Sequence, residues 1–213
     1  MAMIPRLSLV CLASVALLFE ASDAPGAQQA ESPRLDTGNA IRVSLITEGS
    51  SRPGSQVVLE AQQQATMIYD AIGVSLEWAD ERGSQDDETA PTHLVAVVLS
   101  DARTEQFLRG KEVLPSVLGV APHQTGRVYV FWDRIARRAW ENDVLPQIVL
   151  ARVLAHEIGH QMLPLQGHSE SGIMRPSLNY RAAAPPTFTD AEAAAIRTFL
   201  SAAPREPLDT AAD

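Results

Sequence analysis

The segment His156-Glu157-Ile158-Gly159-His160 carries side chains that could bind and use a metal ion. Residues four apart lie on the same face of an α-helix, so the two histidines could direct ring nitrogens at one zinc ion, with Zn–N distances of about 2.0 to 2.1 Å. Glu157 is offset by one position, where its carboxylate would reach a metal-bound water and act as a general base. Gly159 would leave room for a closely approaching part of the chain. The pattern predicts a catalytic zinc site.

A catalytic zinc usually has three protein ligands, and His168 is the natural third. Pro164 cannot continue the helix. Gly167 can adopt the positive φ that a sharp reversal often needs, which would bring His168 back beneath the helix end. Glu170 or a more distant acid is the alternative third ligand. The two remaining histidines of the chain, His93 and His123, are expected to be ordinary strand-end or loop residues.

The spacing of apolar residues predicts the strands and helices that position these side chains. Residues 40–47 alternate apolar and polar side chains, as in a strand with one buried face, and residues 94–99 form a continuous apolar run suited to a central strand. The Gly-interrupted segment 117–121 resembles an edge strand. We expect further strands at 74–78 and 127–132, helices at 56–72 and from about 146 to 163, a helical turn at 135–140, and a final helix from 189 that ends before Pro204.

Helix-capping residues support two of these assignments. Asp143 can cap the helix of the histidines, with Pro146 in its first turn, where a missing N–H costs little. Thr189 and Glu192 have the spacing of a capping box at the start of the last helix. Between the second and third strands, residues 80–89 are acidic and predict a solvated loop.

The motif region resembles the metzincin zinc peptidases. These enzymes share the pattern HExxHxxGxxH followed by a methionine-containing turn, and this chain has Gly172-Ile173-Met174 after His168. Two departures are visible: Leu163 stands where the family has glycine, and His168 follows His160 by eight residues instead of six. The resemblance covers residues 156–174 by motif and about 40–200 by element order.

The resemblance implies both a site and a fold. His156, His160 and His168 would be the zinc ligands, Glu157 the general base and Met174 the turn methionine. The expected fold is α+β and metzincin-like, with a mixed twisted sheet of about four to five strands, a backing helix, an active-site helix and a C-terminal helix. The expected reaction is hydrolysis of peptide bonds by a zinc-bound water activated by Glu157.

Three other readings of the same motif remain open. A thermolysin-like peptidase would take a glutamate as its third ligand, with Glu192 as the candidate. A zinc-containing binding protein without catalysis would have no use for Glu157. A structural zinc site normally needs four protein ligands.

Tyr180 could stabilise the tetrahedral intermediate, although simple packing is the plainer expectation. Residues 117–121 could pair with an extended substrate.

The N-terminus predicts export. One positive charge precedes an apolar run at 7–19 and then small polar residues, so we expect a signal peptide at 1–27 and a secreted or periplasmic bacterial protein. A flexible leader at 28–39, a metallopeptidase catalytic domain at 40–203 and a disordered tail at 204–213 would follow. Cys11 is the only cysteine and would leave with the signal peptide, so no disulfide is expected.

Charge limits the possible partners. The chain has 213 residues and a formal net charge of −9, which argues against nucleic acids and anionic membrane surfaces. No stretch reaches the roughly 18 to 20 apolar residues of a membrane span. We expect a protein or peptide substrate, and no stable membrane association once the signal peptide is removed.

Overall fold

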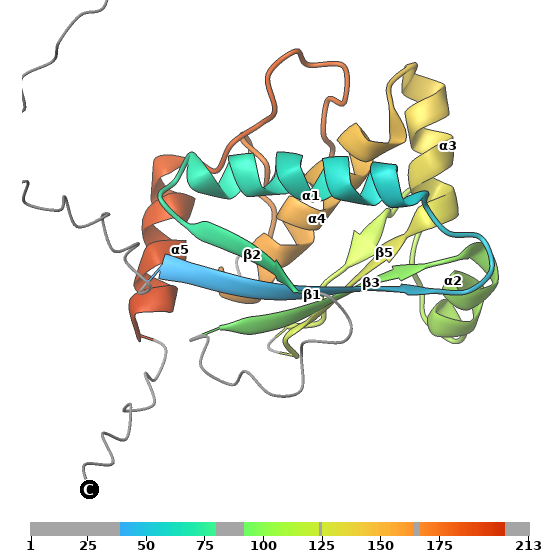
Figure 1. The fold of residues 1–213 in the computed structure, drawn as a ribbon, viewed down its shortest axis with the longest axis horizontal. Helices are drawn as coiled ribbons and strands as arrows, with labels where there is room; N and C mark the ends of the chain where they lie inside the picture. The colour runs from blue at the N-terminus through green and yellow to red at the C-terminus, as the bar shows by residue number, and fades with distance from the viewer. Residues whose placement is uncertain (1–38, 80–91, 124, 164–166, 203–213) are drawn as a thin grey trace, which may run out of the picture. The chain divides into compact units, whose positions relative to one another are not determined.

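A computed structural model describes residues 39–79, 92–123, 125–163 and 167–202. The predicted signal peptide, leader, acidic loop and C-terminal tail, together with Pro164, lie outside the described residues, and the predicted domain boundaries stay predictions. The described residues form one sheet of five strands and five helices (Figure 1). The elements in chain order are β1 (Ala40–Glu48), α1 (Ser55–Asp70), β2 (Ser75–Ala79), β3 (His93–Leu99), α2 (Asp101–Leu108), β4 (Gly119–Val120), β5 (Arg127–Phe131), α3 (Trp132–Asn142), α4 (Pro146–Met162) and α5 (Asp190–Ala202).

The sheet is mixed, as predicted, and the expected α+β fold class is confirmed. Its strand order is β2-β1-β3-β5-β4. The first four strands in this order run parallel, and β4 pairs antiparallel with β5, with Gly119 opposite Val130 and Val120 opposite Tyr129. The segment predicted to be an edge strand therefore does lie at the edge of the sheet.

Burial of β3 on both faces explains its continuous apolar sequence. Ala96 and Val98 face the main core, which α1 and α4 cover (Figure 1). Val97 and Leu99 face the opposite side, where they join Phe131 and the partly buried Phe107 of α2 in a smaller cluster. A strand between two apolar layers needs apolar residues in succession. The prediction of a central strand here is confirmed.

Two boundaries differ from the sequence prediction. Helix α3 has 11 residues where a single turn was expected. Asp143 does not cap α4: it has a left-handed φ of 53° and ends α3, with its N–H bonded to the carbonyls of Ala139 and Trp140. Helix α4 follows Leu145 with no side-chain cap, and Pro146 stands in its first turn as predicted. The short link between α3 and α4 thus uses the aspartate for a backbone reversal, because Asp tolerates this conformation better than most residues.

The capping box of α5 is present. The Thr189 N–H donates to Glu192 Oε2 at 2.8 Å, and the Glu192 N–H donates to Thr189 Oγ1 at 3.3 Å. These bonds satisfy two of the N–H groups that a helix start leaves without partners. Among the described helices, none is both long and apolar enough to span a bilayer.

Candidate metal centre

Helix α4 presents two of the predicted ligands at the floor of a cleft. His156 is buried, His160 is partly exposed, and their Nε2 atoms are 3.1 Å apart. Two ligands of a tetrahedral zinc ion with Zn–N bonds of about 2.0 to 2.1 Å would be about 3.3 Å apart. The separation of the two nitrogens therefore fits a shared zinc ion.

His168 completes the cluster from the loop after α4. One ligand nitrogen from each of His156, His160 and His168 lies within 4.8 Å of the others. The His168 ring stacks on that of His156, with centroids 5.1 Å apart. Three histidine nitrogens this close together match the number of protein ligands that a catalytic zinc requires, which leaves its fourth position open. The structure thus brings together all three histidines that the sequence predicted.

The chain between α4 and His168 includes residues 164–166, which lie outside the described residues, and Gly167 is the one glycine of this link. Gly167 does not have a positive φ, so that part of the prediction is wrong. The left-handed residue is Gly172, with φ 74°, where a Cβ would lie 2.6 Å from the Thr187 carbonyl oxygen. The loop closes on itself through the Ser169 N–H, which donates to the Met174 carbonyl at 2.9 Å. A tight turn therefore follows His168 and contains the methionine.

A backbone carbonyl group fixes the orientation of the His156 ring. Its Nδ1 lies 2.8 Å from the Ile173 carbonyl oxygen, which can only accept, so Nδ1 carries the proton. The neutral ring then offers the lone pair of Nε2 to the cleft, as a metal ligand must. Burial lowers the pKa of His156, and burial together with the neighbouring histidines lowers the pKa of His160 to about 4. Both rings are therefore neutral near pH 7 and ready to bind a cation.

Glu157 lies in the same cleft, against the edge strand. Its side chain is 7% exposed, and burial raises its pKa to about 8. A Cβ added to Gly119 of β4 would lie 2.9 Å from both Cγ and Oε1 of Glu157 and 2.9 Å from the Tyr129 carbonyl oxygen. Only glycine at position 119 leaves space for this carboxylate. A cation bound nearby would favour its ionised form.

The turn that contains Met174 packs against α4 at Gly159. Met174 is 1% exposed, and a Cβ added to Gly159 would lie 2.8 Å from its sulfur and 3.0 Å from Phe188 Cε1. Gly159 thus admits a closely approaching part of the chain, as the sequence analysis expected. The contact packs the turn against the helix between the two histidines of the motif.

A buried arginine on α4 anchors the segment that carries Tyr180. Arg152 Nη1 donates to the Asn179 carbonyl at 2.6 Å, and Nη2 donates to the Ala182 carbonyl at 3.0 Å. Tyr180, between these two carbonyls, is 6% exposed and lines the cleft beside Glu157. Burial raises the pKa of Tyr180 to about 12, against the opposite influence of Arg138 and Arg152. Its hydroxyl therefore stays protonated and can donate a hydrogen bond.

The cleft has a volume of about 800 Å³. The three histidines and Glu157 form part of its lining, together with β4 and the chain on either side of β4. The segment from Arg175 to Tyr180 lines it as well. Its volume falls in the range of known ligand sites. A peptide segment could enter beside the candidate metal site.

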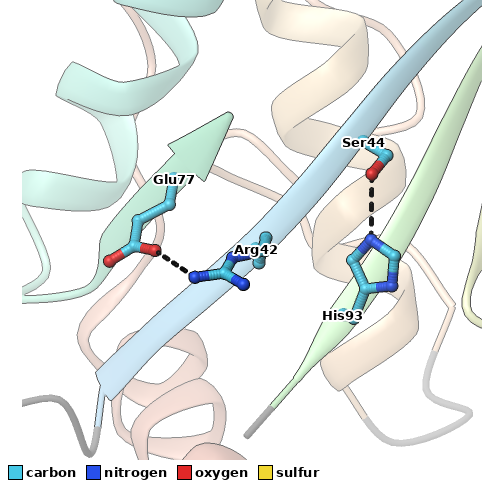
Figure 2. A network of polar contacts seen from close by, with 4 residues as sticks. All are labelled: Arg42, Ser44, Glu77 and His93. Carbon is cyan, nitrogen blue, oxygen red and sulfur yellow. Dashed lines mark hydrogen bonds and ion pairs between the residues drawn. The ribbon is translucent and has the colours of Figure 1, made fainter. Parts of the chain in front are cut away.

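The other histidines and acidic residues considered as ligands lie outside the cluster of three histidines. Glu192 belongs to the capping box of α5 and accepts a hydrogen bond from Ser169 Oγ. His93, at the start of β3, is hydrogen-bonded to Ser44 at 3.0 Å, next to an Arg42–Glu77 ion pair of 3.6 Å (Figure 2). Within the described residues, neither of these side chains nor Glu170 or His123 belongs to a cluster that could hold a metal ion.

Sequence reasoning did not identify Gly119 and Arg152 as parts of the site. Both carry a signal in retrospect. Gly119 interrupts a short strand, which often marks a close approach of another part of the chain. Arg152 stands inside the apolar run of α4, and a buried arginine needs fixed acceptors. Neither signal identifies the contact partner, because both partners are distant in the sequence.

No family model and no curated protein sequence matches the chain. Among solved structures, an archaemetzincin from Methanopyrus kandleri is similar, with 15% sequence identity, a TM-score of 0.49, and coverage of 76% of this chain and 97% of that one.

Proposed function

We propose that the protein is an exported zinc-dependent endopeptidase. The observation that carries the proposal is the convergence of His156, His160 and His168 in a cleft that also holds the carboxyl group of Glu157. The ligand set favours zinc, because three neutral imidazoles with an open fourth position are typical of catalytic zinc sites. Export is inferred from the N-terminal sequence alone.

Zinc bound there would polarise the scissile carbonyl and lower the pKa of water toward about 7. Glu157 would accept a proton from the attacking water and return it to the leaving amine nitrogen. The position of its carboxylate against Gly119 supports this role, because the contact limits the directions in which the side chain can move. Tyr180 would donate its O–H to the developing negative charge on the carbonyl oxygen.

An extended peptide would bind along β4. This strand pairs with β5 on one side and is the last strand in the sheet order. An edge strand offers backbone N–H and C=O groups that an antiparallel substrate strand can bind. Because Gly119 of β4 contacts Glu157, a peptide in this position would pass directly beside the general base.

The ligand positions support the metzincin-like reading over the thermolysin-like one. The carboxylate oxygens of Glu192 accept hydrogen bonds from Ser169 and from the start of α5, whereas His168 faces the other two histidines. Under the proposal, His168→Ala lowers zinc content well below one ion per chain. Full zinc content in His168→Ala would instead favour a glutamate ligand.

The test compares zinc content and hydrolysis of casein or gelatin by the purified protein, by Glu157→Gln and by the matched control Glu77→Gln, which changes an exposed glutamate of β2. We expect one zinc per chain in all three proteins. Activity should fall by at least about 100-fold in Glu157→Gln only, because a general base typically contributes 10²- to 10⁴-fold.

Each other outcome contradicts a different part of the proposal. Absence of zinc from all three proteins would overturn the metal site. Zinc without hydrolysis in any of them would favour a zinc-containing binding protein. Equal activity in Glu157→Gln and the parent protein would refute the role of the glutamate as the base.

A further inference from the structure

The candidate peptide cleft has the opposite charge to the protein around it. Its charged lining residues are Lys111, Arg138 and Arg175, with Glu157 as the one acidic side chain of the described lining. The chain as a whole carries a formal net charge of −9. A cleft of one sign on a protein of the other sign concentrates the field at the site where a substrate enters.

The three cations come from three separate segments. Arg175 directly follows Met174, is exposed, and forms no ion pair among the described residues. Lys111 follows α2, and its ammonium lies 3.6 Å from the centroid of the Phe107 ring, which also lines the cleft. Their common location results from the fold and not from a local run of basic residues.

Arg138 reaches the cleft from α3. Its Nε is 3.3 Å from the exposed Glu141 carboxylate, and its side chain is 30% exposed. In the described part of the chain, Nη1 and Nη2 of this guanidinium have no protein partner. The charge of Arg138 acts on Tyr180, which lines the same cleft and whose hydroxyl has no acceptor among the described residues. The Nη groups of Arg138 and the hydroxyl of Tyr180 are thus hydrogen-bond donors in this part of the cleft, where Glu157 is the one acidic side chain of the described lining.

We propose that this cleft selects substrates by a carboxylate group, and that the preferred substrate is a peptide with Asp or Glu near the scissile bond. The inference rests on the proposed peptidase function and names its substrate class. Guanidinium groups bind carboxylates in a planar, often bidentate geometry, and an ammonium adds a flexible point charge. The carboxylate of a free peptide C-terminus has the same chemistry, so the experiment must distinguish the two sources.

The experiment uses the full chain loaded with zinc and four fluorogenic peptides of one length. One is neutral with an amidated C-terminus, one has internal Glu residues and is amidated, one has internal Lys residues and is amidated, and one is neutral with a free C-terminus. We expect kcat/KM to be highest for the internal-Glu peptide. Its advantage should shrink as salt rises from about 0.02 to 0.5 M, because the screening length falls.

Substitutions in the cleft assign the preference to particular residues. Arg175→Ala and Arg138→Ala should each reduce the Glu-to-neutral ratio by about 1.5- to fivefold, the range that exposed charge pairs of about 0.2 to 1 kcal/mol give. Arg175→Glu should shift the preference toward the Lys peptide. Arg103→Ala on the exposed face of α2 removes the same charge outside the cleft and should leave the ratio unchanged.

A binding measurement keeps the inference testable without catalysis. Fluorescence anisotropy of the same peptides with Glu157→Gln should show the same order of affinities. Equal hydrolysis and equal binding of all four peptides would overturn the inference and leave the peptidase proposal intact. Binding of the Glu peptide without hydrolysis by the parent protein would support the cleft selectivity while contradicting the peptidase proposal. A preference for the free C-terminus alone would keep carboxylate recognition but replace the internal acid by the chain end.

Discussion

Replacing Gly119 with alanine would place one methyl group between the edge strand and the carboxylate of Glu157. The new Cβ would lie 2.9 Å from Cγ and Oε1 of Glu157 and 2.9 Å from the Tyr129 carbonyl oxygen. Non-bonded carbon atoms prefer separations of about 3.5 to 4.0 Å, so the neighbours must move by roughly 0.6 to 1.1 Å. Gly119 is not left-handed, and the backbone itself therefore tolerates alanine.

The way this clash is relieved determines the expected effect. The Tyr129 carbonyl belongs to β5 and is held by the sheet, whereas the Glu157 side chain can rotate. Displacement of a catalytic group by about 1 Å can cost about 10²-fold in rate. We expect kcat/KM of Gly119→Ala to fall by about 10- to 100-fold, equivalent to about 1.4 to 2.7 kcal/mol. Overpacking should also destabilise the fold by about 1 to 3 kcal/mol.

Steady-state hydrolysis, zinc content and thermal unfolding of Gly119→Ala would test this reasoning. Gly54→Ala is a suitable control far from the cleft lining, because an added Cβ there has no atom within 4 Å and the φ of Gly54 is −61°. We expect normal zinc content in both variants and normal activity in the control. Parental activity and an unchanged melting temperature in Gly119→Ala would refute the argument that position 119 must be glycine because of Glu157.

Two further predictions concern the supports of the site. Gly159→Ala should lower the free energy of unfolding by about 1 to 3 kcal/mol, because the added methyl meets the Met174 sulfur at 2.8 Å and Phe188 at 3.0 Å. Denaturant unfolding would measure this loss, and an unchanged midpoint would contradict the packing described. Arg152→Met removes two charged hydrogen bonds to the carbonyls around Tyr180, so we expect a loss of about 1.5 to 3 kcal/mol in stability and a lower kcat with one zinc still bound. Arg152→Lys should not restore kcat, because an ammonium cannot reproduce the planar fork.

The strands and the active-site helix could be predicted because their signals are local. Alternation marks β1, a continuous apolar run marks β3, and a capping box marks the start of α5 at Thr189. Helix α2 was missed because only Thr104 within it is buried, so its sequence lacks apolar periodicity. Helix α3 does carry apolar residues at helical spacing, with Ile135 and Ala139 buried, but the prediction covered only residues 135–140 within it.

In the candidate site as well, only the features that depend on residues close in the sequence could be predicted. His156 and His160 are four residues apart on one helix, so their common direction and the offset of Glu157 follow from helix geometry. The turn at Gly172 and the contact between Gly119 and Glu157 depend on chain segments that meet only in the folded protein. Spacing could identify the chemical groups of the site, but it could not identify the residues that leave space for them.

Helix α4 has a second consequence, for the dynamics of the site. It contacts α1, α3, α5, β4 and β5, and 14 of its 17 residues are buried. Amide hydrogens in such a helix exchange with solvent only through openings that disrupt most of the molecule. The protons around His156 and His160 should therefore be among the slowest to exchange. A histidine pair held in this way keeps its geometry through local fluctuations, and it is lost only when the domain unfolds as a whole.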